Sequence, residues 1–215
     1  FMIKKLSPLP QFLINRYKNW KSSSYLNNSE KFKELASLGQ NPTVMIISCC
    51  DSRIHVTSIF GADEGEFFIH RNIANLVPPF SPDGEHHGTS AAIEYATKEL
   101  KIRYLIVLGH TGCGGIKSGY NLHINNFNPD YIFINKWLNI LRPAFDNISK
   151  NVSQKKQIES LEEEAIKTSL KNLISFPDII NAIEKKTLSI HGLIHDIGSG
   201  EIKYLNPSTE EFEKI

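Results

Sequence analysis

TVMIIS at residues 43–48 is a short, continuous apolar run, and it decides the fold class. Such a run is typical of a strand that is buried on both faces, as in a parallel sheet. A second run, RYLIVL, covers residues 103–108. Further strand patterns lie at residues 66–70, 187–194 and 201–205, and helical patterns lie at 89–100, 129–141 and 157–173. Strands that alternate with helices predict an α/β fold with a mostly parallel central β-sheet flanked by helices.

The first part of the chain has a different character. Two amphipathic helical patterns, at residues 11–22 and 30–38, have apolar faces and little neighbouring chain to cover them. We therefore expect residues 1–38 to form an N-terminal helical arm. Residues 39–215 are expected to form the α/β catalytic domain, so that the protein is a single domain overall with an arm.

The composition excludes several classes of function. The formal net charge of the 215 residues is +1, and the basic residues are scattered, so we expect no nucleic-acid partner. No stretch approaches the length of a membrane span, so we expect no membrane partner either. The chain has three cysteines, two of them adjacent, which is not a disulfide framework. Metal-binding or reactive thiols in a reducing cytoplasm are the better interpretation.

Chemically active side chains follow both apolar runs. CCDSR stands at residues 49–53 and GHTGCGG at 109–115. Because the carboxyl ends of parallel strands meet at one edge of a sheet, these segments can reach one point. Together they offer thiolates, the His110 imidazole and the Asp51 carboxylate, which are all zinc ligand types. The paired knuckles of a structural zinc site are absent, which favours catalytic zinc with a fourth position that can open.

These segments resemble the motifs of the β-class carbonic anhydrases. HRNIANLV at residues 70–77 and His191-Gly192 resemble two further motifs of that family. The resemblance runs from about residue 40 to the C-terminus. It implies an enzyme, a lyase that reversibly hydrates carbon dioxide to bicarbonate and a proton by attack of zinc-bound hydroxide. Carbon dioxide and bicarbonate would be its small-molecule partners, and Zn2+ its cofactor.

The family's C-x-D-x-R pattern also implies the ligand set. It makes Cys49 a zinc ligand and Cys50 the variable position. The other two ligands implied are His110 and Cys113. In this register, Cys50 is a spare thiol beside the metal.

The resemblance implies roles for four more residues or groups. Asp51 either closes the fourth zinc position or is drawn away by Arg53, whose guanidinium can hold a carboxylate with two bonds. The main-chain N–H of Gly112 helps to place the substrate. Gln40 reaches the site of a partner subunit, so that we expect a homodimer or a dimer-based tetramer.

One subgroup of the family has an inhibitory bicarbonate pocket built on a Trp, an Arg and a Tyr. Of these, this chain retains only Arg71, since Ile46 and His195 stand at the other two positions. We therefore expect no such pocket.

Two other functions remain as alternatives. A hydrolase of carbon disulfide or carbonyl sulfide would use the same scaffold and ligands. A catalytically silent, zinc-stabilised interaction protein would need neither Asp51 nor Arg53, and both are present.

Overall fold

The computed structural model describes residues 6–84, 87–124 and 128–215. The chain divides into two compact units, Phe1–Gln40 and Asn41–Ile215. The first unit is helical and consists of α1 (Gln11–Trp20), the π-helical turn η2 (Lys21–Tyr25) and α2 (Ser29–Leu38). Trp20, Tyr25 and Phe32 pack on one another within it. Several of its large apolar side chains are exposed to solvent: Leu6, Leu9, Phe12, Leu13, Tyr17, Leu26 and Leu38.

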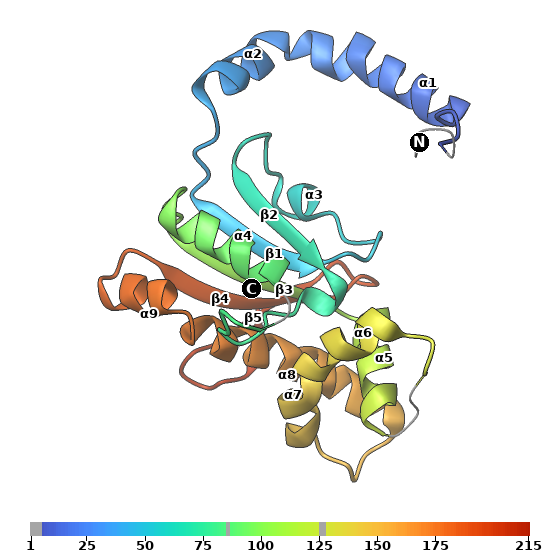
Figure 1. The fold of residues 1–215 in the computed structure, drawn as a ribbon, viewed down its shortest axis with the longest axis vertical. Helices are drawn as coiled ribbons and strands as arrows, with labels where there is room; N and C mark the ends of the chain where they lie inside the picture. Colours follow the sequence, from blue (N-terminus) through green and yellow to red (C-terminus); the bar gives the residue numbers. More distant parts are fainter. Residues whose placement is uncertain (1–5, 85–86, 125–127) are drawn as a thin grey trace. The chain divides into compact units, whose positions relative to one another are not determined.

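The second unit is built on a six-stranded sheet (Figure 1). The strands are β1 (Val44–Cys49), β2 (Phe67–Asn72), β3 (Tyr104–His110), β4 (Ser189–His195), β5 (Ile202–Leu205) and β6 (Phe212–Lys214). Their order across the sheet is β2-β1-β3-β4-β5-β6. The first four strands in this order run parallel, and β5 and β6 are antiparallel. The predicted α/β fold with a mostly parallel sheet is confirmed.

The register of the sheet brings the ends of β1 and β3 together. Ser48 lies opposite both Arg71 of β2 and Leu108 of β3. Both strands are almost entirely buried, which explains their unbroken apolar sequences. As a result, the residues that follow the two apolar runs start at the same edge of the sheet.

Most of the helices of the second unit lie on one face of the sheet, and a short one packs on the other. The helices are α3 (Val56–Phe60), η3 (Ile73–Asn75), α4 (His87–Lys98), α5 (Gly114–His123), α6 (Ile132–Leu138), η4 (Asn139–Leu141), α7 (Arg142–Asn147), α8 (Gln154–Ile174) and α9 (Pro177–Glu184). The expected helices at 89–100 and 157–173 correspond to α4 and α8. The expected helix at 129–141 begins later and ends in the 3-10 turn η4. None of the described helices is long and apolar enough to cross a membrane.

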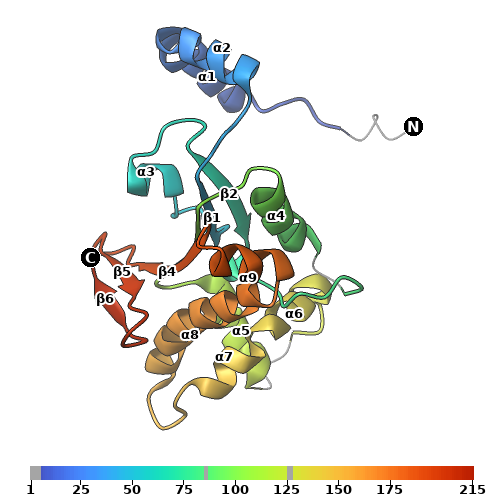
Figure 2. The same cartoon turned by 90° about the vertical axis from the view of Figure 1, so that its left-hand side faces the viewer.

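The long helix α8 packs closely on β3 and β4, and α5, α6 and α7 gather beside it (Figure 2). Two glycines permit this approach. A Cβ atom at Gly109 would lie 2.7 Å from Ile166 of α8, and one at Gly192 would lie 2.8 Å from the same side chain. The helix therefore rests on the end of β3, directly beside the edge where the ligand residues gather.

Candidate metal centre

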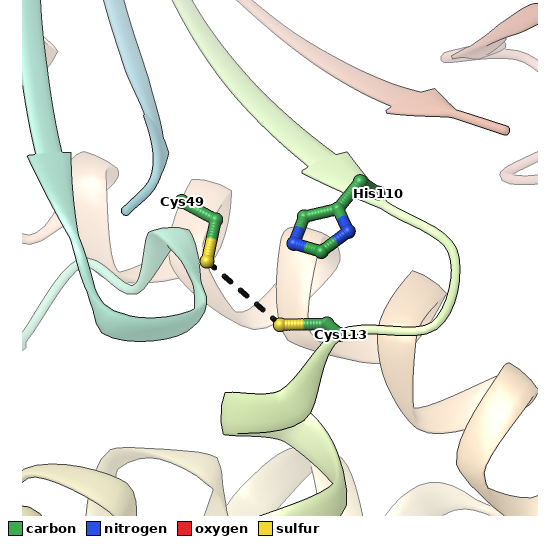
Figure 3. A group of neighbouring side chains, drawn as sticks. All are labelled: Cys49, His110 and Cys113. Carbon is green, nitrogen blue, oxygen red and sulfur yellow. Dashed lines mark hydrogen bonds between the residues drawn. The ribbon is translucent and has the colours of Figure 1, made fainter. Parts of the chain in front are cut away.

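Three buried side chains converge at this edge of the sheet (Figure 3). Cys49 is the last residue of β1, His110 is the last residue of β3, and Cys113 is the N-cap of α5. Their exposed fractions are 5%, 1% and 2%. One ligand atom of each lies within 4.8 Å of the others, and the two sulfur atoms are 3.9 Å apart. The structure thus brings together the three residues that the resemblance implies as metal ligands.

The turn between His110 and Cys113 depends on a glycine. Gly112 has a φ of 66°, in the left-handed region where a side chain is disfavoured. This conformation folds the chain back so that the helix α5 starts directly after Cys113. The imidazole and the second thiol therefore face the same point although only two residues separate them.

The donor set fits a metal ion of the zinc type. The Nδ1 atom of His110 lies 3.0 Å from the carbonyl oxygen of Thr111, and a carbonyl can only accept a hydrogen bond, so Nδ1 carries the proton. Nε2 is then a free lone pair, and among the described residues this buried atom has no partner. One imidazole nitrogen with a free lone pair and two thiol sulfurs form a ligand set that zinc favours.

The ionisation of the cluster also favours a cation. The hydrogen bond from the Cys113 thiol lowers the pKa of Cys49, and the same bond raises the pKa of Cys113. Burial lowers the pKa of His110, but the neighbouring Cys49 thiolate and the Thr111 carbonyl outweigh it and raise the pKa. The cluster therefore holds protons that a bound cation would displace.

Asp51 lies beside this cluster and is held by Arg53. Nε and one terminal nitrogen of Arg53 donate to the two carboxylate oxygens at 2.9 and 2.7 Å. These bonds hold the pKa of Asp51 well below its usual range. The same arginine donates to the carbonyl oxygen of Gly112 at 3.1 Å. One carboxylate oxygen of Asp51 is still only 3.9 Å from Nε2 of His110, so a small movement would bring it into the ligand cluster.

Glu162 of α8 is part of the site and was missed by the sequence analysis. It is 4% exposed, and it accepts a hydrogen bond of 2.9 Å from the main-chain N–H of Cys113. Burial raises its pKa to about 7, although the N–H groups of Cys113 and Gly112 act in the opposite direction. The expected role of the Gly112 N–H in placing substrate remains a prediction.

Gln40 and Cys50 both lie outside the buried cluster. Gln40 is the last residue of the first compact unit and is exposed, so its role toward a partner subunit remains a prediction. Cys50 is exposed and is not among the three clustered donors.

Comparison with known proteins identifies the family. Residues 44–202, well over half of the chain, match the sequence profile of the family described as carbonic anhydrase. The chain belongs to the carbonic anhydrase family. It is similar to Beta carbonic anhydrase 3 of Arabidopsis thaliana, with 35% identity over 185 residues, which covers 85% of this chain and 71% of that protein. The resemblance to the β-class is confirmed, and with it the assignment of the enzyme as a lyase.

Solved structures of carbonic anhydrases share the fold. The β-carbonic anhydrase CcaA superposes with a TM-score of 0.88 at 30% identity, covering 95% of this chain and 91% of that chain. A structure from a study of two tetrameric β-carbonic anhydrases of Sordaria macrospora superposes with a TM-score of 0.77, also at 30% identity, covering 91% and 96%. The arrangement of strands around the ligand cluster is therefore that of β-carbonic anhydrases.

Proposed function

We propose that this carbonic anhydrase reversibly hydrates carbon dioxide to bicarbonate and a proton, with zinc held by Cys49, His110 and Cys113. The observation that supports this most directly is the buried cluster in which the sulfur atoms of Cys49 and Cys113 lie beside Nε2 of His110, an atom with no hydrogen-bond partner among the described residues. Bound there, zinc would supply the Lewis acidity that yields a reactive nucleophile from water near neutral pH.

The chain's own residues would control the fourth position. Arg53 keeps Asp51 ionised and holds its carboxylate at the edge of the cluster. From that place the Asp51 carboxylate can accept a hydrogen bond from a group bound near Nε2 of His110, 3.9 Å away, and so orient it for attack. An ionised aspartate accepts hydrogen bonds only, which fixes the direction of the bond.

We further propose that the enzyme is a homodimer or a dimer-based tetramer. A related structure is described as tetrameric, and the first unit has many exposed apolar side chains that another subunit could cover. Removal of residues 1–38 should lower both association and activity. Analytical ultracentrifugation that finds a fully active monomer would contradict this. A cytoplasmic location is proposed on the free thiols alone, two of them buried.

A stopped-flow assay with a pH indicator tests the reaction. The chain as purified should hydrate carbon dioxide, lose the activity with a chelator, and regain it with zinc. Assays with carbonyl sulfide and carbon disulfide belong in the same experiment, because the ligand cluster is common to both kinds of enzyme. Zinc-loaded protein that is active on a sulfur compound but not on carbon dioxide would refute the proposal. Zinc-loaded protein with no activity at all would support a silent interaction protein.

A further inference from the structure

The side chain of Arg71 spans the turn that joins Cys49 to Asp51. We call the Asp51 carboxylate, held by Arg53 beside the cluster, the gate. Its Nε donates to the carbonyl oxygen of Cys49 at 2.9 Å, and a terminal nitrogen donates to the carbonyl oxygen of Asp51 at 2.7 Å. Only Cys50 lies between these two carbonyls in the chain. A single planar guanidinium therefore fixes the main chain on both sides of that residue.

The same turn is supported from the main chain of β2. The N–H of Cys50 donates to the carbonyl oxygen of Asn72 at 2.9 Å. Asn72 is itself fixed, because its side-chain amide exchanges two hydrogen bonds, of 2.8 and 2.9 Å, with the main chain of Leu76. The end of β2 thus provides a rigid base on which Arg71 holds the turn.

Two arginines then divide the control of Asp51 between them. Arg53 holds the carboxylate, whereas Arg71 holds the main chain from which that carboxylate extends. The separation that these bonds maintain is small, since the carboxylate lies 3.9 Å from Nε2 of His110. A shift of the main chain by about 1–2 Å would bring the Asp51 carboxylate to the metal position, where an anionic oxygen is a good zinc ligand.

We propose that Arg71 is a positioning residue, which acts through the main chain of Cys49 and Asp51 to keep the Asp51 carboxylate out of the fourth metal position. The inference rests on the proposed function, since it assumes that the cluster binds zinc. It assigns to Arg71 a role that differs from binding bicarbonate directly, because two of its nitrogens are bonded to main-chain carbonyls.

Cobalt(II) in place of zinc makes the prediction visible. The absorption spectrum of cobalt depends on the number and type of its ligands, so it reports whether a carboxylate has joined the two sulfurs and the imidazole. Full-length protein would be loaded with cobalt as the wild type, Arg71→Gln, Arg71→Lys and Arg103→Gln, all at one pH. Arg103 is the matched control, since it is an exposed arginine just before the first residue of β3, whereas His110 is the last residue of that strand.

We expect Arg71→Gln to bind one cobalt per chain with a changed spectrum, and the zinc form to lose roughly 10- to 100-fold in turnover, as for other residues that orient metal ligands. Arg71→Lys keeps the charge but not the two-pronged geometry, and it should recover only part of the loss. Arg103→Gln should match the wild type. In an Asp51→Asn background, the spectra with and without Arg71→Gln should be the same, because an amide cannot replace the carboxylate as an anionic ligand.

A spectral change that persists in the Asp51→Asn background would overturn the proposal, as would a wild-type spectrum in Arg71→Gln. If Arg71→Gln fails to fold or to bind metal, Arg71→Lys decides, and a wild-type spectrum with wild-type turnover in that variant refutes the role. A variant whose only defect is a changed response to added bicarbonate would show direct anion binding instead. A wild-type enzyme that does not hydrate carbon dioxide would refute the proposed function, yet the cobalt spectra would still decide the role of Arg71.

Discussion

Substitution of Gly109 by alanine tests whether the packing of α8 on β3 holds the metal centre in place. The new Cβ atom would lie 2.7 Å from Cδ1 and 3.0 Å from Cγ1 of Ile166, which is fully buried and cannot turn into solvent. Overpacking of this kind costs about 1–3 kcal/mol of folding free energy. Glu162, one turn earlier on α8, binds the N–H of Cys113, so a displaced helix would also disturb the ligand turn after His110.

A second substitution makes the reasoning specific. Ile166→Val removes Cδ1, the nearer of the two atoms, and should cost roughly 0.5–1.5 kcal/mol alone. The double variant Gly109→Ala/Ile166→Val should lose about 1 kcal/mol less stability than the sum of the losses of the two single variants, as is usual for residues in contact. Gly192→Ala is the matched control. Its Cβ would meet Cγ2 of Ile166 at 2.8 Å and Cδ1 of Leu170 at 2.9 Å, and Ile166→Val removes neither atom.

Urea unfolding measures the stabilities of the metal-loaded variants. The comparison holds if the slope of the unfolding free energy against urea concentration is the same for all of them. The hydration assay measures whether activity follows them. We expect Ile166→Val to offset part of the cost of Gly109→Ala, so that the double variant is about as stable as Gly109→Ala alone and regains activity, whereas in the Gly192→Ala background the two costs should add. Strict additivity at Gly109, or equal rescue at both glycines, would refute the packing argument. A destabilised Gly109→Ala with full activity would refute the link between α8 and the metal centre.

Three further predictions concern the metal, the gate and the pH profile. Cys49→Ser should lose zinc and activity while Cys50→Ser keeps both, and elemental analysis with the reverse result would exchange the two assignments. Arg53→Ala should retain zinc but lose roughly 10- to 100-fold in turnover, because the Asp51 carboxylate loses the two bonds that hold it away from the cluster, and unchanged turnover would exclude a gate. Hydration should rise from neutral to alkaline pH with a slope near one proton, and bicarbonate should act only as product, because Ile46 cannot supply the N–H of a tryptophan to an inhibitory pocket. A steeper curve that moves to higher pH with bicarbonate would show that such a pocket exists.

The strands were predictable because burial leaves a simple trace in the sequence. The runs at residues 43–48 and 103–108 match β1 and β3, since a strand covered on both faces is apolar throughout. Helix α5 was not predicted, because GGIKSGYNLH contains three glycines, which are poor helix formers. Tertiary packing compensates for them. Gly119 lies directly against Leu141, and a Cβ at Gly115 would lie 2.8 Å from Ile73, so the glycines allow neighbouring segments to approach.

The three clustered donors of the candidate metal centre were predictable and their supports were not, for a physical reason. Side chains that bind a metal must be of a few types, and both motifs that carry them stand at the ends of buried strands. Glu162 and Arg71 bind main-chain groups instead, and every residue offers those groups, so no residue type at the receiving end marks the contact. Glu162 reaches Cys113 across 49 residues of sequence. Arg71 stands in the motif at residues 70–77 and at one position of the inhibitory pocket, but the sequence does not indicate which main-chain groups it binds.

The hydrogen bond that orients His110 has a consequence for how this site can change during evolution. Its acceptor is the carbonyl of Thr111, which any amino acid at that position would supply. A point mutation can therefore hardly erase it, and the imidazole keeps its metal-binding tautomer. The bonds that restrain Asp51 come from the side chains of Arg53 and Arg71, and each can be lost in one step. A single substitution at Arg53 or Arg71 should accordingly lower turnover while the three clustered donors still bind metal, so a lineage of inactive, zinc-bearing proteins could arise without any change to the cluster itself.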